Sequence, residues 1–339
     1  MSKKTITILL VVFGALAGIF ILQSYLSKPS KNLDSDSMVS ISFTPDAIAS
    51  IRVFKQDYPD SGLIFTKKDT NWVVVNEFNT PAKNEEIAKL LADLGTVKGT
   101  LRGESEDLYT DFAIDEKNAL QINLLSADNS ELMHLYVGKG GPDGQTCFIR
   151  LPGSPKVYLA DKNFISRFAA WNAEPSKKLP TDRWMNLNLS GLDRNSVNSV
   201  KLHTPKFDYE FVMQMEPSVD SLAPPTKKWK QISPAKNMLE DNKISAITGS
   251  IATLAARGVA NPAFAGQFGL DKPSYSIWAA DSLGHTALIS FSDKIDTLDN
   301  RYAIVMGRNT VYRVDKGLFE RVFVTPFEKP KEPKATAKK

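Results

Sequence analysis

Short stretches that alternate between apolar and polar positions make up most of the first half of the chain. They occur at residues 48–53, 63–66, 71–75, 120–125, 132–137, 146–150 and 157–160. A period of two is typical of half-buried strands, because successive side chains point to opposite faces of a sheet. Turn-like segments separate neighbouring stretches, so we expect a mostly antiparallel sheet.

A change of period marks one longer helix among these strands. Pro81 lies at its expected start, and apolar residues then recur at i, i+3, i+4 and i+7, which places them on one stripe. These residues are Ile87, Leu90, Leu91 and Leu94. Gly95 lies where such a helix would end. The pattern predicts an amphipathic helix on the sheet, and a second, short helix follows at 164–168.

The second half of the chain repeats this order. Residues 197–202 restate 48–53, and Tyr312 restates Tyr158. The helical stripe returns, 157 positions later, as Ile244, Ile247 and Ile251. An insertion at 216–226 contains three prolines and predicts a long surface hairpin loop. Apolar positions that recur at a nearly constant offset over this length indicate duplicated domains.

A turn precedes a strand in each copy. It occupies residues 112–115 (Phe-Ala-Ile-Asp) in the first copy and 268–271 (Phe-Gly-Leu-Asp) in the second. Gly269 is expected to adopt a positive φ at little cost, whereas Ala113 is expected to avoid one. The two turns should therefore differ in backbone shape.

The N-terminal segment has the properties of a membrane anchor. Residues 5–26 carry no charged side chain and as a helix reach about 33 Å, enough to cross a ~30 Å hydrocarbon core. The alternative is a signal peptide cleaved near Ala15, but the apolar run continues past that point. We predict an anchor at 1–27, with a short basic head that leaves the rest of the chain outside the cytoplasm.

Length and charge complete the predicted organisation. A chain of 339 residues exceeds a single core, so we expect domains at 41–180 and 181–325, after a polar linker at 28–40. The fold class is α+β: an N-terminal transmembrane helix and two similar tandem domains, each a mostly antiparallel sheet with one amphipathic helix. The net charge of +4 comes from the two ends, including a basic, disordered tail at 326–339. This distribution gives no basic face for nucleic acid.

No group of residues has the spacing of a metal or catalytic centre. His134, His203 and His285 are the only histidines and lie far apart in sequence, without a zinc-binding spacing. Asp115 and Asp271 occupy the same turn in separate copies, so we interpret them as residues that close a turn rather than as an acid–base pair. We predict no catalytic, cofactor-binding or metal-ligating residues.

Two further features suggest chemistry but favour structural roles. The glycine-rich segment 138–144 lacks the Gly-Lys-Ser/Thr ending and the following helix of a nucleotide-binding loop, so it predicts a flexible hairpin loop. Cys147 is the only cysteine, which excludes an internal disulfide. Its apolar neighbours are typical of a buried small residue.

The tryptophans separate into repeated and unrepeated positions. Trp72 and Trp229 are 157 positions apart and are predicted to be equivalent core residues. Trp171 and Trp184 flank the predicted domain junction. They are expected to pack one domain on the other; the alternative is an exposed aromatic contact for a partner or glycan.

The combination of these motifs resembles the bacterial domain-of-unknown-function family 4340 over about residues 41–325. The motifs are the Trp strand at 71–74, the Pro-led helix, the turn at 268–273, the Phe148-Ile149-Arg150 strand and Val157-Tyr158. The first copy departs from the pattern at Ala113 and Lys117, where the Gly and Pro of the turn are missing, and 301–303 reverses the aromatic-Arg order.

This resemblance implies a location and a partner. Members of the family are similar in having one N-terminal span and an extracytoplasmic body, and are often encoded beside gliding-type ABC transporter components. We therefore expect a single-pass protein of the bacterial inner membrane with a periplasmic body. Its expected function is that of a non-enzymatic accessory protein that contacts an ABC-type transporter or a gliding/envelope assembly. The alternatives are a binding domain for a cell-wall or secreted ligand and, third, an enzyme.

Overall fold

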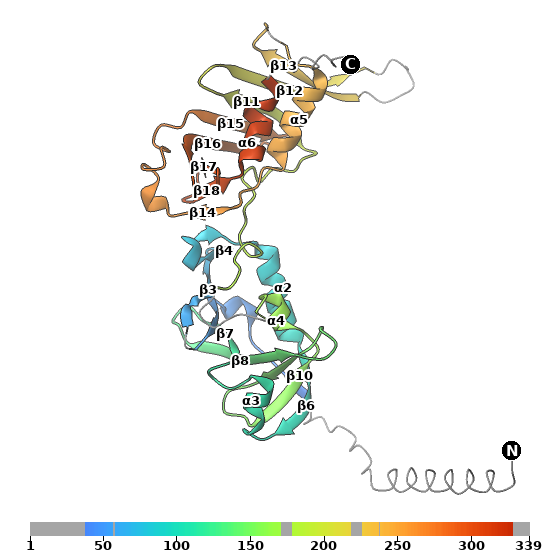
Figure 1. Ribbon diagram of the computed structural model, residues 1–339. Coiled ribbons are helices and arrows are strands. Elements are labelled where there is room, and N and C mark those ends of the chain that lie inside the picture. Colours follow the sequence, from blue (N-terminus) through green and yellow to red (C-terminus); the bar gives the residue numbers. More distant parts are fainter. Residues whose placement is uncertain (1–37, 57, 171–177, 218–225, 237, 328–339) are drawn as a thin grey trace, which may run out of the picture. The chain divides into compact units, whose positions relative to one another are not determined.

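The computed structural model describes residues 38–56, 58–170, 178–217, 226–236 and 238–327 (Figure 1). The predicted anchor at 1–27 and residues 328–339 of the predicted tail lie outside these residues. Within the described part of the chain, no helix is both long and apolar enough to cross a membrane.

The first sheet contains ten strands among the described residues. They are β1 (Met38–Ser40), β2 (Ser50–Lys55), β3 (Tyr58–Lys68), β4 (Asn71–Val74), β5 (Thr80–Pro81), β6 (Lys98–Glu104), β7 (Leu120–Leu125), β8 (Glu131–Gly140), β9 (Cys147–Arg150) and β10 (Lys156–Ala160). The helices that accompany them are α2 (Asn84–Thr96), α3 (Leu108–Phe112) and α4 (Phe164–Arg167). The neighbours β7, β8, β9, β10 and β6 pair antiparallel in that order.

The second sheet contains eight strands among the described residues. They are β11 (Val197–His203), β12 (Asp208–Glu216), β13 (Thr226–Ser233), β14 (Gly258–Ala260), β15 (Tyr275–Asp281), β16 (Thr286–Ile295), β17 (Arg301–Val305) and β18 (Val311–Val314). The helices are α5 (Asp241–Ala252) and α6 (Lys316–Phe323). The two sheets are mostly antiparallel, so the α+β prediction with few helices is confirmed.

The strand orders of the two sheets correspond. The first sheet contains the run β6-β10-β9-β8-β7-β2-β3-β4, and the second runs β14-β18-β17-β16-β15-β11-β12-β13. Each strand therefore has a counterpart at the same place along the chain and in the sheet. The first sheet adds β1 beside β6 and β5 beside β4. The repeat inferred from apolar spacing is present in the topology.

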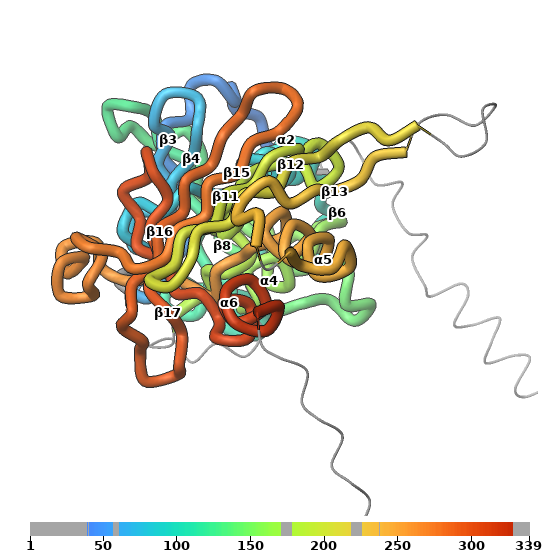
Figure 2. Tube along the Cα trace, turned by 90° about the horizontal axis from the view of Figure 1, so that it is seen from above, coloured from blue at the N-terminus to red at the C-terminus, as the bar shows by residue number. Residues whose placement is uncertain are grey.

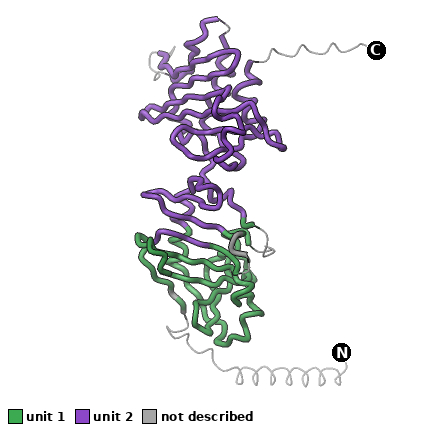
Figure 3. The backbone as a smooth tube through the Cα atoms, turned by 90° about the vertical axis from the view of Figure 1, so that its left-hand side faces the viewer, with its two compact units in different colours: residues 1–47, 53–62, 90–179 green, residues 48–52, 63–89, 180–339 purple. Residues whose placement is uncertain are grey.

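The described chain divides into two compact units (Figure 3). Within the described residues, unit 1 comprises 38–47, 53–62 and 90–179, and unit 2 comprises 48–52, 63–89 and 180–327. This division passes through β2, β3 and α2, so the domain boundaries at 41–180 and 181–325 stay a prediction. Ordered structure extends past the predicted domain limits at both ends. Strand β1, which lies in the predicted linker, pairs with β6, and Phe327, which lies in the predicted tail, packs on Phe207.

The two longer helices bury their predicted stripes. In α2 the buried residues of the stripe are Ile87, Leu90 and Leu94, while Leu91 is only half-buried; in α5 they are Ile244, Ile247 and Ile251. Each of these buried side chains is at most 1% exposed, and full burial of such a side chain contributes about 1.5 to 3 kcal/mol. Figure 2 shows α5 beside the β12–β13 hairpin. Gly95 lies within the last turn of α2, which ends at Thr96.

The prediction that Ala113 avoids a positive φ is wrong. Ala113 has φ 53°, and Gly269 has φ 77°. The hydrogen bonds also correspond: Ala113 N–H donates to Thr110 O and Ile114 N–H to Tyr109 O. In the second copy, Gly269 N–H donates to Gly266 O and Leu270 N–H to Ala265 O, at the same separations. The two turns therefore share one left-handed C-cap arrangement.

Tertiary contacts account for this conformation of Ala113. The side chain of Arg150 is buried, and its Nε donates to Ile114 O at 2.6 Å. Its guanidinium lies 3.6 Å from the Tyr136 ring centroid and 4.5 Å from that of Tyr109. These contacts fix the backbone immediately after Ala113, so packing overrides the local cost of a left-handed alanine.

An aromatic pair beside each turn is also duplicated. Phe112 and Phe148 lie with ring centroids 4.1 Å apart, and Phe268 and Tyr302 lie at the same 4.1 Å. In each copy, the first ring belongs to the turn and the second to the strand at the equivalent place in the sheet. The repeat thus extends from topology to individual side-chain contacts.

The predicted equivalence of Trp72 and Trp229 in the core is wrong. Trp72 is buried at 8% exposure, whereas Trp229 is only half-buried. Trp72 lies on β4, which is covered by β5, and its carbonyl accepts from Ala82 N–H. Trp229 lies on β13, the edge strand of the second sheet. The two positions thus differ in their place in the sheet, since β4 has β5 as an outer neighbour and β13 has none among the described strands.

Hairpins form at the two predicted loops. Glu216 and Thr226 are directly paired, so the proline-rich insertion connects the ends of β12 and β13; residues 218–225 lie outside the described part. Gly140 pairs with Cys147, so the glycine-rich segment connects β8 to β9, as predicted. The sequence reasoning missed β1, β6 and α3, which contain few apolar residues or are very short.

Candidate functional site

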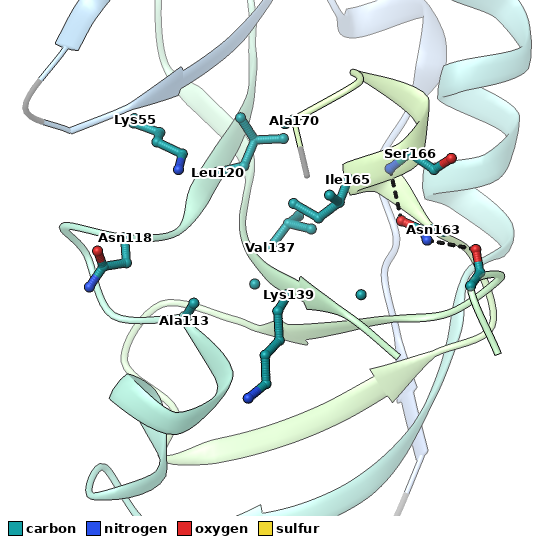
Figure 4. A pocket seen from close by; sticks show the side chains of 13 residues that line it. Lys55, Ala113, Asn118, Leu120, Val137, Lys139, Asn163, Ile165, Ser166 and Ala170 are labelled. Carbon is teal, nitrogen blue, oxygen red and sulfur yellow. Dashed lines mark hydrogen bonds between the residues drawn. The ribbon is translucent and has the colours of Figure 1, made fainter. Parts of the chain in front are cut away.

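Unit 1 contains a cavity of about 360 Å³, here named the unit 1 cavity (Figure 4). Its apolar lining includes Leu120 from the start of β7, Val137 from β8 and Ile165 from α4. Lys55, at the end of β2, and Lys139, near the end of β8, are its charged lining residues. The cavity therefore combines an apolar surface with two cationic side chains.

Glycine allows β8 to pass close to the Ala113 turn beside this cavity. A Cβ on Gly138 would lie 2.1 Å from Phe112 O and 2.4 Å from Ile114 Cγ2, both far inside van der Waals contact. Gly140 is less constrained, since a Cβ there would lie 3.7 Å from Asn163 Nδ2. Gly138 therefore sets the approach of the hairpin to the turn.

Asn163 joins the glycine-rich hairpin to the short helix α4. Its Nδ2 donates to Gly144 O at 2.8 Å, and its Oδ1 accepts from Ser166 N–H at 2.9 Å (Figure 4). One side chain thus caps the helix and holds the tip of the hairpin. The walls of the unit 1 cavity, although distant in sequence, are fixed to one another.

The charged side chains that line the unit 1 cavity, among the described residues, are both lysines. No carboxylate is among its lining residues within the described part of the chain. The nearby Asp143 carboxylate accepts from the Thr146 side chain and from Gln145 N–H, and these bonds hold its pKa below its usual value. Burial lowers the pKa of Lys55, which shows a partly desolvated ammonium group. The Lys139 ammonium lies 5.6 Å from the Phe112 ring centroid.

Unit 2 contains a cavity of about 300 Å³, here named the unit 2 cavity. Its lining includes Phe207, Tyr275, Phe323 and Phe327, with Lys206 as its charged residue. The aromatic side chains contact one another: Phe207 and Phe327 have centroids 4.4 Å apart, and Tyr275 and Phe323 are 5.2 Å apart. This cavity is therefore mainly aromatic.

The two cavities occupy corresponding places in the repeated fold. Lys55 in one and Thr204 in the other are 149 positions apart, the offset that relates 48–53 to 197–202. Ala170 and Val324 are 154 positions apart, the offset that relates Tyr158 to Tyr312. Each cavity thus lies between the end of the first repeated strand and the segment after the last repeated helix.

The three histidines are held apart on separate elements. His134 on β8 contacts Gln121 Oε1 at 3.0 Å and Glu131 Oε2 at 3.4 Å. His203 contacts Asp208 at 2.6 Å, and His285 contacts Asp281 at 2.8 Å. Each partner is a near neighbour in sequence or on the adjacent strand. Among the described residues, no group of three or more His, Cys, Asp or Glu side chains is arranged to hold a metal ion.

The remaining candidate residues have local structural surroundings. The Asp115 carboxylate accepts from Asn118 N–H and Nδ2, which closes its turn as predicted, while Asp271 is exposed. Cys147 is buried, and burial raises the pKa of its thiol to about 11. A thiol with this pKa is almost wholly protonated at neutral pH and is a poor nucleophile.

Trp184 is buried, which rules out the alternative of an exposed contact at that position. Its ring centroid lies 5.2 Å from that of Phe65 on β3, and its carbonyl accepts from Lys83 N–H. Trp171 lies outside the described residues. Sequence reasoning did not identify either cavity, because Lys55, Lys139 and Asn163 share no sequence motif.

The fold and its cavities define a class: a tandem of two antiparallel sheets, each with a cavity beside its last helix. Residues 72–273, more than half of the chain, match the model of the family described as Domain of unknown function (DUF4340). The chain belongs to this family, which confirms the resemblance inferred from the motifs. No curated protein and no solved structure matches the chain.

Proposed function

We propose that this protein is a membrane-anchored, extracytoplasmic binding protein of the bacterial inner membrane that acts without catalysis. The observation that carries this proposal is the presence of a cavity at corresponding places in both sheets. The unit 1 cavity has the size and the mixture of apolar and polar lining that small-ligand sites have. Residues 5–26 supply the anchor in this proposal.

A cavity-filling variant tests small-ligand binding directly. Ala170 lines the unit 1 cavity and is 6% exposed, so Ala170→Leu should occupy part of the space. Ala92→Leu, on the exposed face of α2, is the matched control. Protein purified from the native membrane is denatured, and the released small molecules are identified by mass spectrometry. We expect a molecule that wild type and Ala92→Leu retain and Ala170→Leu lacks; equal recovery from all three would contradict the proposal.

The second candidate function is contact with a protein of an ABC-type transporter or gliding assembly, as an accessory subunit. Two highly exposed apolar side chains favour it: Leu283 (76% exposed) and Met306 (68%). They lie in the β15–β16 and β17–β18 turns, at the same end of the second sheet, because Met306 N–H donates to Leu288 O near the start of β16. Leu298, also exposed, lies in the β16–β17 turn at the opposite end.

Affinity purification in mild detergent tests this second function. A transporter component should co-purify with wild type and with Leu298→Asp, but be depleted from Leu283→Asp/Met306→Asp. Recovery of the chain alone across several detergents would contradict a stable partner.

The anchor and its orientation have their own test: a reporter that is active only outside the cytoplasm, fused after Val324, should be active. An inactive but well-expressed fusion would overturn the proposed location.

A further inference from the structure

The outer edge of β4 in the first sheet is covered by other segments of the chain. Ala82 N–H donates to Trp72 O at 2.8 Å. Residues 81–83 pair antiparallel with residues 184–186, through one β-bridge and two backbone hydrogen bonds of 2.7 Å. Trp184, in the covering segment, is 1% exposed. An extended segment with a buried tryptophan therefore closes this edge.

The second copy has the same sequence motif without this cover. The sequence Pro-Ala-Lys-Asn occurs at residues 81–84 and again at 234–237. Ala82 in the first motif is 5% exposed, whereas Ala235 in the second belongs to the exposed residues. Strand β13 has β12 on one side and none of the described strands on the other (Figure 1). Among the described residues, this edge of the second sheet is therefore open.

The open edge offers both backbone groups and apolar side chains. Strand β13 is eight residues long, and alternate residues of an edge strand direct their N–H and C=O groups away from the sheet. On the same strand, Trp229 is half-buried and Ile232 is 46% exposed. Met238, which follows the strand, is 56% exposed. An extended peptide that adds a strand to a sheet uses this combination, since backbone bonds hold it and side-chain contacts select it.

The charge of β13 limits which segment can pair with it. The strand carries Lys227, Lys228 and Lys230. Lys228 forms ion pairs with Glu216 at 3.7 Å and with Asp241 at 3.0 Å. Within the described part of the chain, Lys227 and Lys230 form no ion pair. Lysines on an edge strand oppose pairing with a second, equally basic edge, so charge disfavours a second copy of this chain and favours an acidic segment.

We propose that the β13 edge binds an extended segment of a partner protein in which an aromatic residue lies beside acidic side chains. The aromatic residue has the role that Trp184 has in the first sheet, and the acidic side chains face Lys227 and Lys230. Residues 328–339 of this chain do not fit, because they contain five Lys, two Glu and no aromatic residue. The edge shares no residue with either cavity, so the inference goes beyond the proposed small-ligand function and does not depend on it.

Titration of the full chain in a non-ionic detergent with three end-blocked peptides tests the proposal. The first peptide is the chain's own segment 181–188, the second is this segment with Arg183→Glu, and the third carries Trp184→Ala in addition to Arg183→Glu. We expect the second peptide to bind about threefold or more tightly than the first, as exposed ion pairs allow. The third should bind at least about tenfold more weakly than the second, because it lacks the aromatic anchor.

Substitutions in the chain identify the edge. Lys227→Glu/Lys230→Glu should weaken binding of the acidic peptide about fivefold or more, without weakening the peptide that retains Arg183. Lys117→Glu/Lys272→Glu makes the same change of charge at exposed positions outside β13 and should have little effect. Thermal unfolding checks that both double variants are folded. If the β13 variant fails to fold, the order of the three peptides on wild type still tests the charge and the aromatic residue.

Hydrogen–deuterium exchange locates the bound peptide. With the acidic peptide at saturation, exchange should slow in residues 226–233 and stay unchanged in 81–83, which are already paired. The proposal is overturned if none of the peptides binds, if all three bind equally, or if the protected residues lie outside 226–233. A dimer that protects 226–233 without peptide would place a second copy at this edge and would equally overturn the acidic partner.

Discussion

The two sheets have the same backbone topology and turn geometry, and they differ in the side chains that line their cavities. Both have the same strand order, the same left-handed turn and an aromatic pair at 4.1 Å beside that turn. Their cavities occupy corresponding places, yet one is lined by two lysines and the other by aromatic rings. The repeat therefore preserves the strand order, the turn geometry and the aromatic contact, and varies the residues that line the cavities.

The largest expected difference between the copies concerns Trp72 and Trp229. Truncation of Trp72 to Ala should lower the free energy of unfolding by roughly 3 to 5 kcal/mol, as for large aromatic residues in a core. Trp229→Ala, at the half-buried edge position, should cost less than about 2 kcal/mol. Denaturant unfolding of the two variants checks the ranking. Equal losses of stability would contradict the difference in burial between Trp72 and Trp229.

A second comparison concerns two glycines of β8, of which only Gly138 faces the Ala113 turn. Gly138→Ala should cost roughly 2 to 3 kcal/mol, because its Cβ would overlap Phe112 O. Gly140→Ala, two positions along β8, has its nearest contact at 3.7 Å and should cost less than about 1 kcal/mol. Thermal unfolding of both variants is the measurement. A neutral Gly138→Ala would show that the turn and the hairpin are not in the close contact described.

Substitutions in the two turns should change stability less, and in opposite directions in the two copies. Gly269→Ala should destabilise by about 1 kcal/mol, because the space around its Cβ is adequate, at 3.7 Å, but φ is positive. Ala113→Gly should leave stability unchanged or raise it by up to ~1 kcal/mol, since relief of the left-handed alanine outweighs the added chain entropy. Both are measured by denaturant unfolding. A clear loss of stability in Ala113→Gly would contradict the shared turn geometry.

The smallest effect is a pH dependence confined to the first sheet. Burial lowers the pKa of His134; Glu131 partly opposes this shift, and Arg150 adds to it. The folded chain therefore favours the neutral His134 ring. The contribution of this ring to the free energy of unfolding is fully present above the ordinary His pKa of about 6.5 and is lost as the pH falls below that value. His134→Gln should reduce the slope of melting temperature against pH between about pH 7 and 5. His203→Gln, at an exposed position, is the matched control; identical slopes in all three proteins would exclude this role.

The sequence predicted the parts of the fold that depend on local periodicity. The helical stripes and the longer strands followed from spacing alone, because burial of one face imposes that spacing. Strand β6 was missed because Leu101 is its only large apolar residue among polar and glycine positions. The conformation of Ala113 was predicted wrongly because distant contacts from Gly138 and Arg150 impose it.

The candidate site was less accessible to sequence reasoning. Lys55, Lys139 and Asn163 meet only after β2, β8 and α4 have assembled. The glycine-rich segment was correctly predicted as a hairpin loop, but its role as a cavity wall requires its contacts with α4. The edge position of Trp229 likewise depends on the absence of a β5 counterpart, which its own strand sequence does not reveal.

Hydrogen–deuterium exchange of the full chain, with and without the small molecule recovered from the native protein, tests most directly the claim that one topology supports two different sites. Protection is measured at the same time in the glycine-rich hairpin 138–144 and in 204–207, the corresponding edge of the unit 2 cavity. The account predicts slower exchange in 138–144 and in α4, with no change in 204–207. Equal protection of both cavities, or protection of 204–207 alone, would contradict it.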